Sequence, residues 1–363
     1  MFRTPRRLSR RSQTSSDRVS SHLAADLPLQ PHRSHWRRPL WAGLLLFGLL
    51  LVILMLSLTQ GAVTLSRSEL WLAALRQGEP SHQTILWELR MPRLLAALLV
   101  GSALGMAGAL LQGMLRNGLA SPFLLGISTG AGLVVVGLVS LGVWQAWAPL
   151  GAWLGAIATT LVVYLLARTG SGVSVERLIL GGLAFSSLFG AMQSMLLLLS
   201  RDGRVQAALT WLIGSLNGRG WREVTVAGPA ILAALALGCL LSRQVNLLSL
   251  GDELAVGLGV SLTRSRCLIG ATAALLAASA VSVAGLVGFV GLIVPHGVRL
   301  LVGTDYRLIL PFSALGGALL LSTADLAARS GSVELPVGIV TALLGAPVFI
   351  AILYRRSAIS GGL

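Results

Sequence analysis

The sequence predicts an all-α polytopic membrane protein that crosses the bilayer about ten times. Of its 363 residues, 55% are hydrophobic and 11% are charged, whereas a soluble domain carries about 25% charged residues. Apolar runs of helix length recur along the chain, and none alternates polar and apolar residues as the strands of a membrane barrel do. Because a segment inside a bilayer must satisfy its own backbone hydrogen bonds, we expect these runs to be helices.

An arginine-rich segment precedes the apolar part of the chain. Residues 1–38 contain nine arginines and two aspartates, which account for +7 of the net charge of +15. The segment is rich in Ser, Pro and His and has no apolar period, so we expect a disordered tail. Its position beside a membrane helix argues against the nucleic-acid binding that +15 alone would suggest. We expect the tail to set the topology or to adhere to anionic lipid.

An uncharged apolar run at 41–58 follows the tail and is long enough to cross a hydrocarbon core of ~30 Å. It is too long for a signal peptide and no A-x-A cleavage site follows it, so we expect a retained membrane helix. Nine further runs lie at 92–114, 122–143, 147–167, 176–199, 223–242, 264–286, 290–302, 308–329 and 336–354. Ten crossings place both termini on one side of the membrane, and the arginine-rich tail predicts that this side is cytoplasmic.

These runs divide the chain into three predicted parts. Residues 1–38 form the disordered basic cytoplasmic tail, residues 39–356 the ten-helix transmembrane domain, and residues 357–363 a short C-terminal tail. The Arg355–Arg356 pair directly after the last run agrees with a cytoplasmic C-terminus. We therefore expect a multi-pass protein surrounded by the lipid bilayer.

Several irregular segments interrupt this pattern. Gly101, Gly105 and Gly108 share one helix face, which predicts close helix packing. Pro295 has no amide donor, so we expect a break or a short helix there. The apolar piece Val205–Leu216 is too short to span the bilayer, which predicts an interfacial or re-entrant helix.

The longest loop on the predicted cytoplasmic side covers residues 243–266. Its length and its glycines predict two short helices joined by a turn along the membrane face. It holds a group of six apolar side chains, which are Leu247, Leu248, Leu250, Leu254, Val256 and Leu258. An ordinary connector has little need for so many apolar groups, so we expect a docking surface for another protein.

The chain lacks the motifs of an ATP-hydrolysing enzyme. It contains no lysine, and therefore no G-x-x-x-x-G-K-[ST] loop to hold nucleotide phosphates. The apolar runs contain almost no acids, and Asp325, toward one end of its run, is the clearest exception. Because proton-driven and sodium-driven carriers usually hold acids near the middle of the membrane, such a carrier is disfavoured. We expect a transporter subunit that is not itself an enzyme and that receives its energy from another chain. A secondary transporter is a distant alternative.

One enzyme-like string is present at residues 126–130. It fits G-x-S-x-G, in which a strand-to-helix turn exposes the serine. Here the string opens an apolar helix, so the required context is missing. An intramembrane serine protease that uses Ser128 and His296 is the second distant alternative.

Short motifs also occur in a fixed order between about residues 60 and 356. They are R-M-P-R at 90–93, R-N-G-L-A-S-P at 116–122, G-I-S at 126–128, W-L-I-G-S-L at 211–216, L-G-D at 250–252, L-G at 258–259, G-F-V-G-L-I-V-P-H at 288–296, A-D at 324–325 with Arg329, E-L-P-V-G at 334–338 and G-A-P at 345–347. Each motif alone is weak. The ordered set resembles the FecCD family of ABC-importer permeases, which carry iron–siderophore complexes, haem or cobalamin.

The resemblance implies a type II ABC importer permease architecture with ten helices per subunit, in a bacterial cytoplasmic or inner membrane. It implies a dimer with a second permease copy or a paralogue, and a pore along the dimer axis. Two ABC ATPase subunits would bind on the cytoplasmic side, and an extracytoplasmic substrate-binding protein would dock outside. The chain itself would bind no cofactor or metal directly, because ATP is held by the partner subunit.

The resemblance also implies three groups of site residues. Arg90, Arg93 and Arg329 match arginines that receive carboxylates of the binding protein, a role suited to the rigid guanidinium fork. Asn117 and Leu119 match positions that narrow the cytoplasmic end of the pore and form a gate. The loop coupled to the ATPase comprises Leu250, Gly251, Asp252, Glu253, Gly257, Leu258 and Gly259.

The chain departs from the family pattern in two places. Gly118 stands where relatives usually have proline, so we expect a less stiff gate loop. The basic tail is longer than usual. A second constriction is expected near residues 174–176, where no motif matches sharply. Iron(III)–siderophore complexes are the first expected substrate, and haem or cobalamin is the alternative within the same family.

Overall fold

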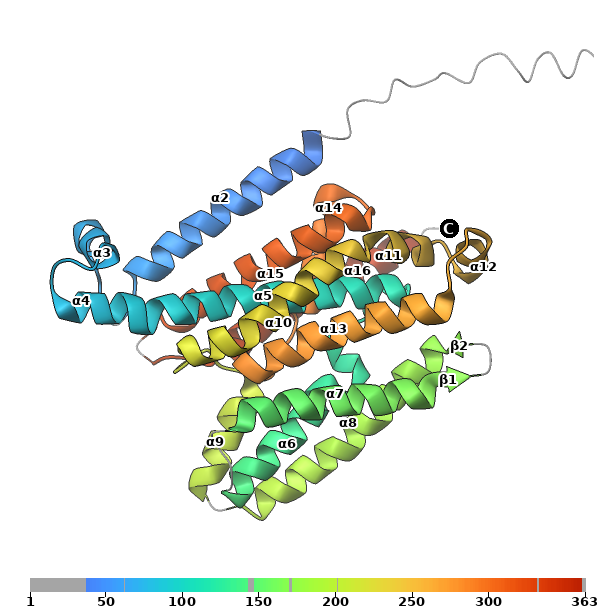
Figure 1. Cartoon of the computed structure of the whole chain (residues 1–363), viewed down its shortest axis with the longest axis horizontal. Coiled ribbons are helices and arrows are strands. Elements are labelled where there is room, and N and C mark those ends of the chain that lie inside the picture. Colours follow the sequence, from blue (N-terminus) through green and yellow to red (C-terminus); the bar gives the residue numbers. More distant parts are fainter. Residues whose placement is uncertain are drawn as a thin grey trace, which may run out of the picture. The chain divides into compact units, whose positions relative to one another are not determined.

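Helices form nearly all of the described chain, as the apolar runs predict (Figure 1). The computed structural model describes residues 37–61, 63–142, 147–169, 172–200, 202–331 and 333–360, so most of the predicted basic tail lies outside the described residues. The longer helices are α2 (Arg37–Thr59), α5 (Met91–Met114), α6 (Ile127–Leu141), α7 (Ala148–Ala167), α8 (Val175–Leu198), α10 (Trp221–Leu240), α13 (Leu262–Ala284), α14 (Val290–Val302), α15 (Tyr306–Ala328) and α16 (Val337–Ser360). The shorter helices are α3 (Arg67–Ala74), α4 (Pro80–Thr84), the π-helix η1 (Ile85–Arg90), the 3₁₀ turn η2 (Pro122–Leu125), α9 (Asp202–Ile213), α11 (Ser242–Ser249) and α12 (Asp252–Gly257).

The predicted helical membrane fold is confirmed. Within the described residues, seven helices are long and apolar enough to cross a membrane. Three shorter apolar helices account for the remaining predicted runs, and these are α6, α14 and the Val337–Ala351 part of α16. Each of the ten apolar runs therefore corresponds to a helix.

The helix that contains α5 begins earlier than its apolar run. The sequence predicts a start at residue 92, whereas α4, η1 and α5 form one continuous helix over Pro80–Met114. Pro92 cannot donate a backbone hydrogen bond and its ring crowds the preceding turn. The π-helical turn just before it widens the spacing, since the Met91 amide bonds to the Leu86 carbonyl. The helix therefore passes the proline without ending.

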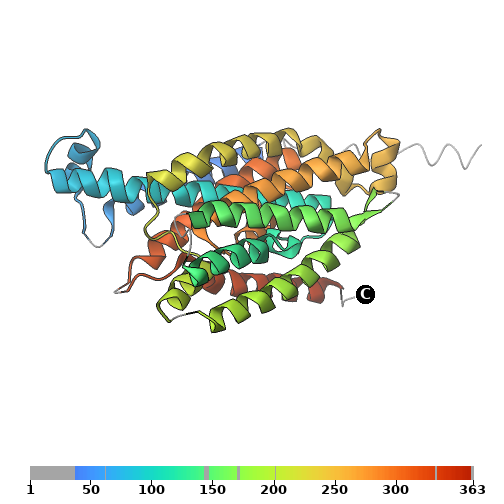
Figure 2. The ribbon, with the colours of Figure 1, turned by 60° about the horizontal axis from the view of Figure 1, so that its bottom comes forward.

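Helix α5 lies at the centre of the bundle, between α10 and α13 on one side and α14 and α15 on the other (Figures 1 and 2). Its glycines allow this packing. A Cβ atom at Gly108 would lie 1.8 Å from the Gly291 carbonyl oxygen, and one at Gly101 would lie 2.3 Å from that of Gly317. The predicted close helix packing is confirmed, and α5 is mostly buried.

Helices α6, α7, α8 and α9 form a second group, which contacts the first through α13 and α7 (Figure 1). Gly130 of α6 and Gly155 of α7 allow a further close crossing, because a Cβ at either would lie under 3 Å from the backbone of the other. A small antiparallel hairpin joins α7 to α8. Its strands β1 (Arg168–Thr169) and β2 (Gly172–Val173) pair Arg168 with Val173 and Thr169 with Gly172.

The break expected at Pro295 lies earlier in the chain. Pro295 is inside α14, which is indeed a short helix of 13 residues. The chain instead turns between Gly285 and Phe289, whose φ angles are +72° and +66°. A Cβ at Gly285 would lie 2.3 Å from the Trp211 carbonyl oxygen, so glycine is required for the close approach of α9 to the end of α13.

The two other irregular segments are helices, as predicted. The short apolar piece is α9, and the longest loop folds into α11 and α12. The turn between them needs Gly251, whose φ of +112° is disfavoured for residues with a Cβ. Val245 of α11 is fully buried beside Gly113 of α5, which anchors this helical pair at the C-terminal end of α5.

Candidate functional site

The predicted docking arginines meet at the N-terminal end of α5. We call Arg90, Arg93, Arg329, Asp325 and Glu334 the arginine cluster. Arg93 Nη2 lies 2.7 Å from Asp325 Oδ1, and its Nη1 lies 2.6 Å from Glu334 Oε1. The same Asp325 carboxylate is 3.5 Å from Arg329 Nε. The Asp325 side chain is 2% exposed, so this acid neutralises buried guanidinium groups.

The other arginine contacts hold the C-terminal end of α2. Arg90 donates to the carbonyl oxygens of Leu58 and Val63, and Arg329 donates to the Ser57 carbonyl at 2.8 Å. Carbonyls in the last turn of a helix lack partners within the helix and carry partial negative charge, which favours a cation there. Burial lowers the pKa of the Arg329 guanidinium from its ordinary value, and Asp325 acts in the opposite direction.

The cluster therefore has two properties that bear on docking. Its three guanidinium groups outnumber its two carboxylates, which leaves one excess positive charge, and Arg90 contacts backbone carbonyls instead of a carboxylate. Its arginines are largely covered, while the Glu334 side chain is 33% exposed. The nearby surface adds Arg76, which lies 5.3 Å from the centre of the Trp87 ring, and the exposed Arg222.

A polar cavity of about 330 Å³ adjoins the cluster through Glu334. Thr210 of α9, the loop after α9 with Ser215, Asn217 and Arg219, and the loop before α16 with Glu334 line it. The Arg219 Nε atom is buried and has no hydrogen-bond partner. Burial lowers the pKa of this guanidinium, and Glu223 opposes that shift. Arg219 and Glu334 therefore place a cation and an anion on the wall of the same cavity.

The predicted coupling residues lie at the other end of α5, on α12 and the turns that flank it. Leu250, Leu254, Val256 and Leu258 are each more than half exposed. Gly257 faces open space, because no atom lies within 4 Å of the position a Cβ would take. Leu250 and Leu258 of the predicted set are thus on an apolar surface that the chain itself leaves uncovered.

Asp252 behaves differently from its neighbours on α12, since its carboxylate contacts the bundle. We call Asp252, Arg116, Arg266 and the Val173 carbonyl the aspartate hub. Arg266 Nη2 donates to both carboxylate oxygens of Asp252 at 2.9 Å, and its Nη1 donates to the Val173 carbonyl at 3.0 Å. Arg116 Nη2 lies 3.6 Å from Asp252 Oδ1. The hub joins α12, α13, the hairpin and the turn after α5.

The predicted gate residues lie in that turn. The Asn117 side-chain oxygen accepts the Leu119 amide at 2.9 Å, and the Ala120 amide bonds to the Asn117 carbonyl at 3.0 Å. Asn117 thus closes the turn around Gly118, while Leu119 is 40% exposed. At the second expected constriction, Ser174 caps α8 by accepting the Arg177 amide at 3.3 Å.

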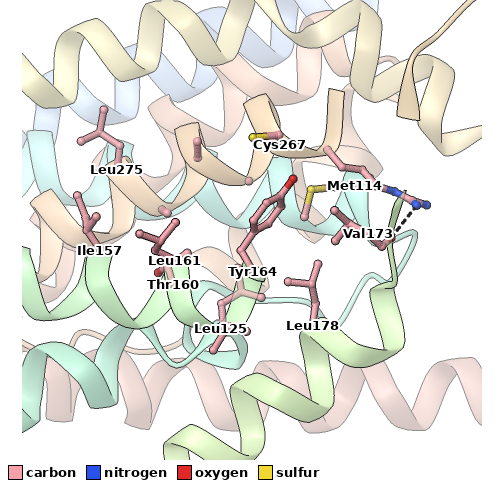
Figure 3. A pocket seen from close by; sticks show the side chains of 15 residues that line it. Met114, Leu125, Ile157, Thr160, Leu161, Tyr164, Val173, Leu178, Cys267 and Leu275 are labelled. Carbon is pink, nitrogen blue, oxygen red and sulfur yellow. Dashed lines mark hydrogen bonds between the residues drawn. The ribbon is translucent and has the colours of Figure 1, made fainter. Parts of the chain in front are cut away.

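An apolar cavity of about 300 Å³ lies beside the hub, between α7, α8, α13 and the end of α5 (Figure 3). Leu161, Tyr164 and Cys267 line it, and the Tyr164 hydroxyl lies toward the Cys267 thiol. Arg266 also lines the cavity, and Figure 3 shows the hydrogen bond to Val173 at that end. The hub therefore borders a space that is not filled by side chains.

The structure gives no support to the serine-hydrolase alternative. Ser128 is buried in the first turn of α6, and the preceding element is the 3₁₀ turn η2 rather than a strand. The strained strand-to-helix turn that exposes a nucleophilic serine is therefore missing. Among the described residues, no three His, Cys, Asp or Glu side chains are grouped so that they could hold a metal ion.

Sequence analysis identified most of these residues but not their pairing. The motifs include Arg116, Asp252 and Asp325, yet they do not indicate which side chains meet. The role of Arg266 was missed altogether. One signal was available, because acids are rare in and near the apolar runs, and an acid that is buried there needs a cation from another part of the chain.

Comparison with known proteins places the chain in a family. A model of the FecCD transport family matches residues 49–355. The chain is 40% identical to the hemin transport system permease protein of Yersinia pestis, over 86% of this chain and 96% of the relative. It is also 40% identical to the Fe(3+)-citrate import system permease protein YfmE of Bacillus subtilis, with 87% and 96% covered. A vitamin B12 import system permease protein of Vibrio cholerae shows 40% identity, with 90% and 97% covered.

Solved structures agree. A metal-chelate type ABC transporter in an inward-facing conformation matches with a TM-score of 0.78 and 32% identity, over 86% of this chain and 99% of the other. The PsaBC protein of Streptococcus pneumoniae, at 18% identity and a TM-score of 0.52, shares the fold. The homologues are permease subunits, which are not enzymes themselves, and the helices agree with a multi-pass membrane protein. The chain therefore belongs to the FecCD transport family and is the membrane permease of an ABC importer.

Proposed function

We propose that this permease imports iron(III)–siderophore and related ferric chelates. The observation that carries the proposal is that several relatives of about 40% identity bear the names of ferric citrate or siderophore systems. Haem is the second candidate, because a hemin permease is equally similar over nearly its whole length. Cobalamin permeases at the same identity make cobalamin the third.

The cognate binding protein tests the substrate most directly. Its affinity would be measured by tryptophan fluorescence for a ferric hydroxamate siderophore, ferric citrate, hemin and cyanocobalamin, each with its metal-free form as the control. We expect the ferric siderophore or ferric citrate to bind at least tenfold more tightly than hemin and cyanocobalamin, a difference of about 1.4 kcal/mol. Preference for hemin or cyanocobalamin would refute the ferric-chelate assignment and leave the importer assignment intact.

The second part of the proposal concerns energy supply. ATP is bound and hydrolysed by two partner ATPase subunits, which dock on α12 and its flanking turns. The exposed apolar side chains there support this, since an uncovered apolar surface on a short loop favours a protein partner. A Cβ added at Gly257 would have no atom of the chain within 4 Å, so we expect Gly257→Trp to extend from the surface and block a partner while the fold is kept.

We expect Gly257→Trp to abolish stimulation of the ATPase while the purified permease keeps its thermal stability. Gly203→Trp is the matched control, because that position in α9 is also open and lies at the other end of the bundle. The readout is ATP hydrolysis by the full complex in lipid nanodiscs. Unchanged stimulation in Gly257→Trp would contradict docking at α12.

We also assign the arginine cluster to docking of the binding protein. The excess positive charge and the polar cavity beside Glu334 support this assignment. A carboxylate of the binding protein would replace Glu334 on Arg93, because Glu334 is the more exposed of the two acids. Glu334→Gln removes the competing charge, so we expect affinity for the binding protein to rise about threefold to tenfold. Unchanged affinity in surface plasmon resonance would contradict the assignment.

Two further parts of the proposal concern assembly. The permease dimerises with a second copy or a paralogue, and the largely exposed apolar helix α8 offers a surface for it. Both termini and α12 lie in the cytoplasm. Glu253→Cys and Asn217→Cys, each in a background with Cys239 and Cys267 replaced by serine, test this orientation. An impermeant maleimide should label position 217 alone in spheroplasts; labelling at position 253 would reverse the topology.

A further inference from the structure

Arg266 connects two elements that are distant in sequence. Its Nη2 atom bonds to Asp252, the first residue of α12, and its Nη1 atom bonds to Val173, the last residue of the hairpin. The side chain is 9% exposed, so water competes weakly for these bonds. A planar guanidinium can hold both acceptors in a fixed geometry, which an ammonium group cannot.

The hairpin passes this contact to α8. The Ser174 amide bonds to the Ala167 carbonyl at 3.0 Å, and the Ser174 hydroxyl accepts the first-turn amide of Arg177. A displacement of Val173 therefore acts on the residue that caps α8. The Arg266 side chain thus links α12 to the start of α8.

A second contact of the hub is with the turn at 116–120 that holds the predicted gate residues, which we call the gate turn. Arg116, which has a φ of +49°, directs its guanidinium to Asp252 at 3.6 Å. A Cβ at Gly251 would lie 3.4 Å from Arg116 Nη1, so the turn before α12 runs directly along this guanidinium. Asn117 and Leu119 follow Arg116 in the same turn. Asp252 is therefore linked to the gate turn through Arg116 and to the hairpin through Arg266.

The space around the hub permits movement. The apolar cavity next to Arg266 lies between α7, α8 and α13, whereas a close-packed interior would resist relative shifts of these helices. The Asp252 side chain is 37% exposed and that of Arg116 is 46% exposed, so this pair can rearrange in contact with water, while the 9% exposed Arg266 keeps its bonds to Asp252 and Val173.

We propose that Asp252, Arg266 and Arg116 are positioning residues that make the hairpin and the gate turn follow α12 when the ATPase closes. Asp252 is the fixed point on α12, Arg266 moves the hairpin and the start of α8, and Arg116 moves the gate turn. This inference rests on the proposed docking of the ATPase at α12.

Distances between spin labels in the complete transporter test it. One pair, Ser249→Cys with Arg168→Cys, reports α12 against the hairpin, because the exposed Ser249 ends α11 just before α12 and lies outside the proposed docking residues. Two other pairs report the hairpin and α12 against α14, each with Leu301→Cys as the reference. All are placed in a background with Cys239 and Cys267 replaced by serine and measured in nanodiscs with and without ATP and vanadate. In the otherwise unchanged protein, we expect the hairpin and α12 to shift together against α14.

Arg266→Lys and Asp252→Asn break the hub in different ways. Lysine keeps a charge for Asp252 but cannot also hold Val173, and asparagine keeps the shape but loses the charge. In both variants we expect α12 to move on its own while the hairpin stays with α14. Stimulation of ATP hydrolysis by the binding protein should fall about fivefold to tenfold. Arg264→Lys is the control, because Arg264 is exposed two residues away on α13.

The outcomes separate the two claims. If the hairpin follows α12 in Arg266→Lys and Asp252→Asn as it does in the parent, the hub proposal is overturned and ATPase docking stands. If α12 itself does not move with ATP in the parent, both proposals fail. Should Arg266→Lys fail to fold, Arg116→Gln tests the second contact with a label at Leu119, since that partly exposed pair is dispensable for stability. A gate turn that still follows α12 would also overturn the proposal.

Discussion

An aspartate pairs with two arginines at each end of α5, but it is buried at one end and open to water at the other. At its N-terminal end, Asp325 pairs with Arg93 and Arg329 and is 2% exposed. Beyond its C-terminal end, Asp252 pairs with Arg266 and Arg116 and is 37% exposed. Both sites place one carboxylate between two guanidinium groups. The difference in burial decides what each pairing can do.

A buried ion pair fixes the elements that it joins, because separating the two charges would leave each of them uncompensated in a low dielectric. A pairing open to water can exchange partners, since the solvent replaces lost contacts at little cost. The arginine cluster therefore holds α2, α5 and α15 together, and the aspartate hub is suited to transmit motion. Helix α5, close-packed through its glycines, is the rigid element that separates them.

Asp325→Ala should have the largest effect on stability. It leaves Arg93 and Arg329 with an uncompensated buried charge, which costs about 3–5 kcal/mol. Asp252→Ala should cost less, about 1–3 kcal/mol, because Asp252 and Arg116 reach water and only Arg266, which is 9% exposed, is left buried without its carboxylate. Thermal unfolding of the purified permease in detergent measures both. Equal losses would break the comparison between the two ends.

Gly108→Ala tests the rigidity of the element between the ends. The added methyl would lie 1.8 Å from the Gly291 carbonyl oxygen, which forces α5 and α14 apart and costs about 1–3 kcal/mol. Gly190→Ala is the control, because no atom lies within 4 Å of the new methyl in α8. A Gly108→Ala variant as stable as the Gly190→Ala control would show that α5 is not held by this contact.

Helix α15 has one aspartate at each end, Asp305 as its N-cap and Asp325 in the arginine cluster, so their contributions to stability can be compared directly. Asp305 caps α15, accepting the Arg307 amide at 2.9 Å and the Asn246 side chain at 2.7 Å. Asp305→Ala should cost about 1 kcal/mol, less than Asp325→Ala. The measurement is the same thermal unfolding, with Asp305→Asn as the variant that keeps the cap. A larger loss than that of Asp325→Ala would reverse the ranking.

The same cap predicts a pH dependence. Although burial acts to raise it, these hydrogen bonds hold the pKa of Asp305 below its ordinary value of 3.8. A lowered folded-state pKa stabilises the protein above the unfolded pKa, and that contribution is lost as the pH falls through the folded pKa. We expect the stability difference between Asp305 and Asp305→Asn to be constant near pH 7 and to shrink below about pH 4. A difference that disappears already near pH 6 would contradict this.

Arg76→Ala should have the smallest effect. Arg76 lies on the same end as the arginine cluster but at the surface, where its contact with Trp87 contributes about 0.5–1 kcal/mol. The comparison thus predicts that exposure, rather than the end of the bundle, determines the cost of losing an arginine. A loss in thermal stability as large as that of Asp325→Ala would show that the whole end is one unit.

The fold followed closely from hydropathy, because a bilayer admits few alternatives to helices. The ten runs, the short α9 and the paired α11 and α12 were all predicted. The start of α5 was not, since a π-helical turn carries the helix across Pro92. At Pro295 a break or a short helix was predicted; α14 is short, and the break itself lies earlier, at the positive φ angles of Gly285 and Phe289. A proline that disfavours a helix is visible in the local sequence. The packing contacts that make the chain turn elsewhere are not.

Sequence alone determined the fold class, the family and the end of the bundle to which each motif belongs, because hydropathy and ordered motifs are local properties of the chain. Tertiary structure decided which charges meet. Arg93 and Asp325 are 232 positions apart, and Arg266 reaches Val173 across 93 positions. Such pairing depends on how helices cross and on how much water reaches them, which no local pattern encodes. The two ends of α5 differ because Asp325 is buried with its partners, whereas Asp252 and Arg116 are in contact with water.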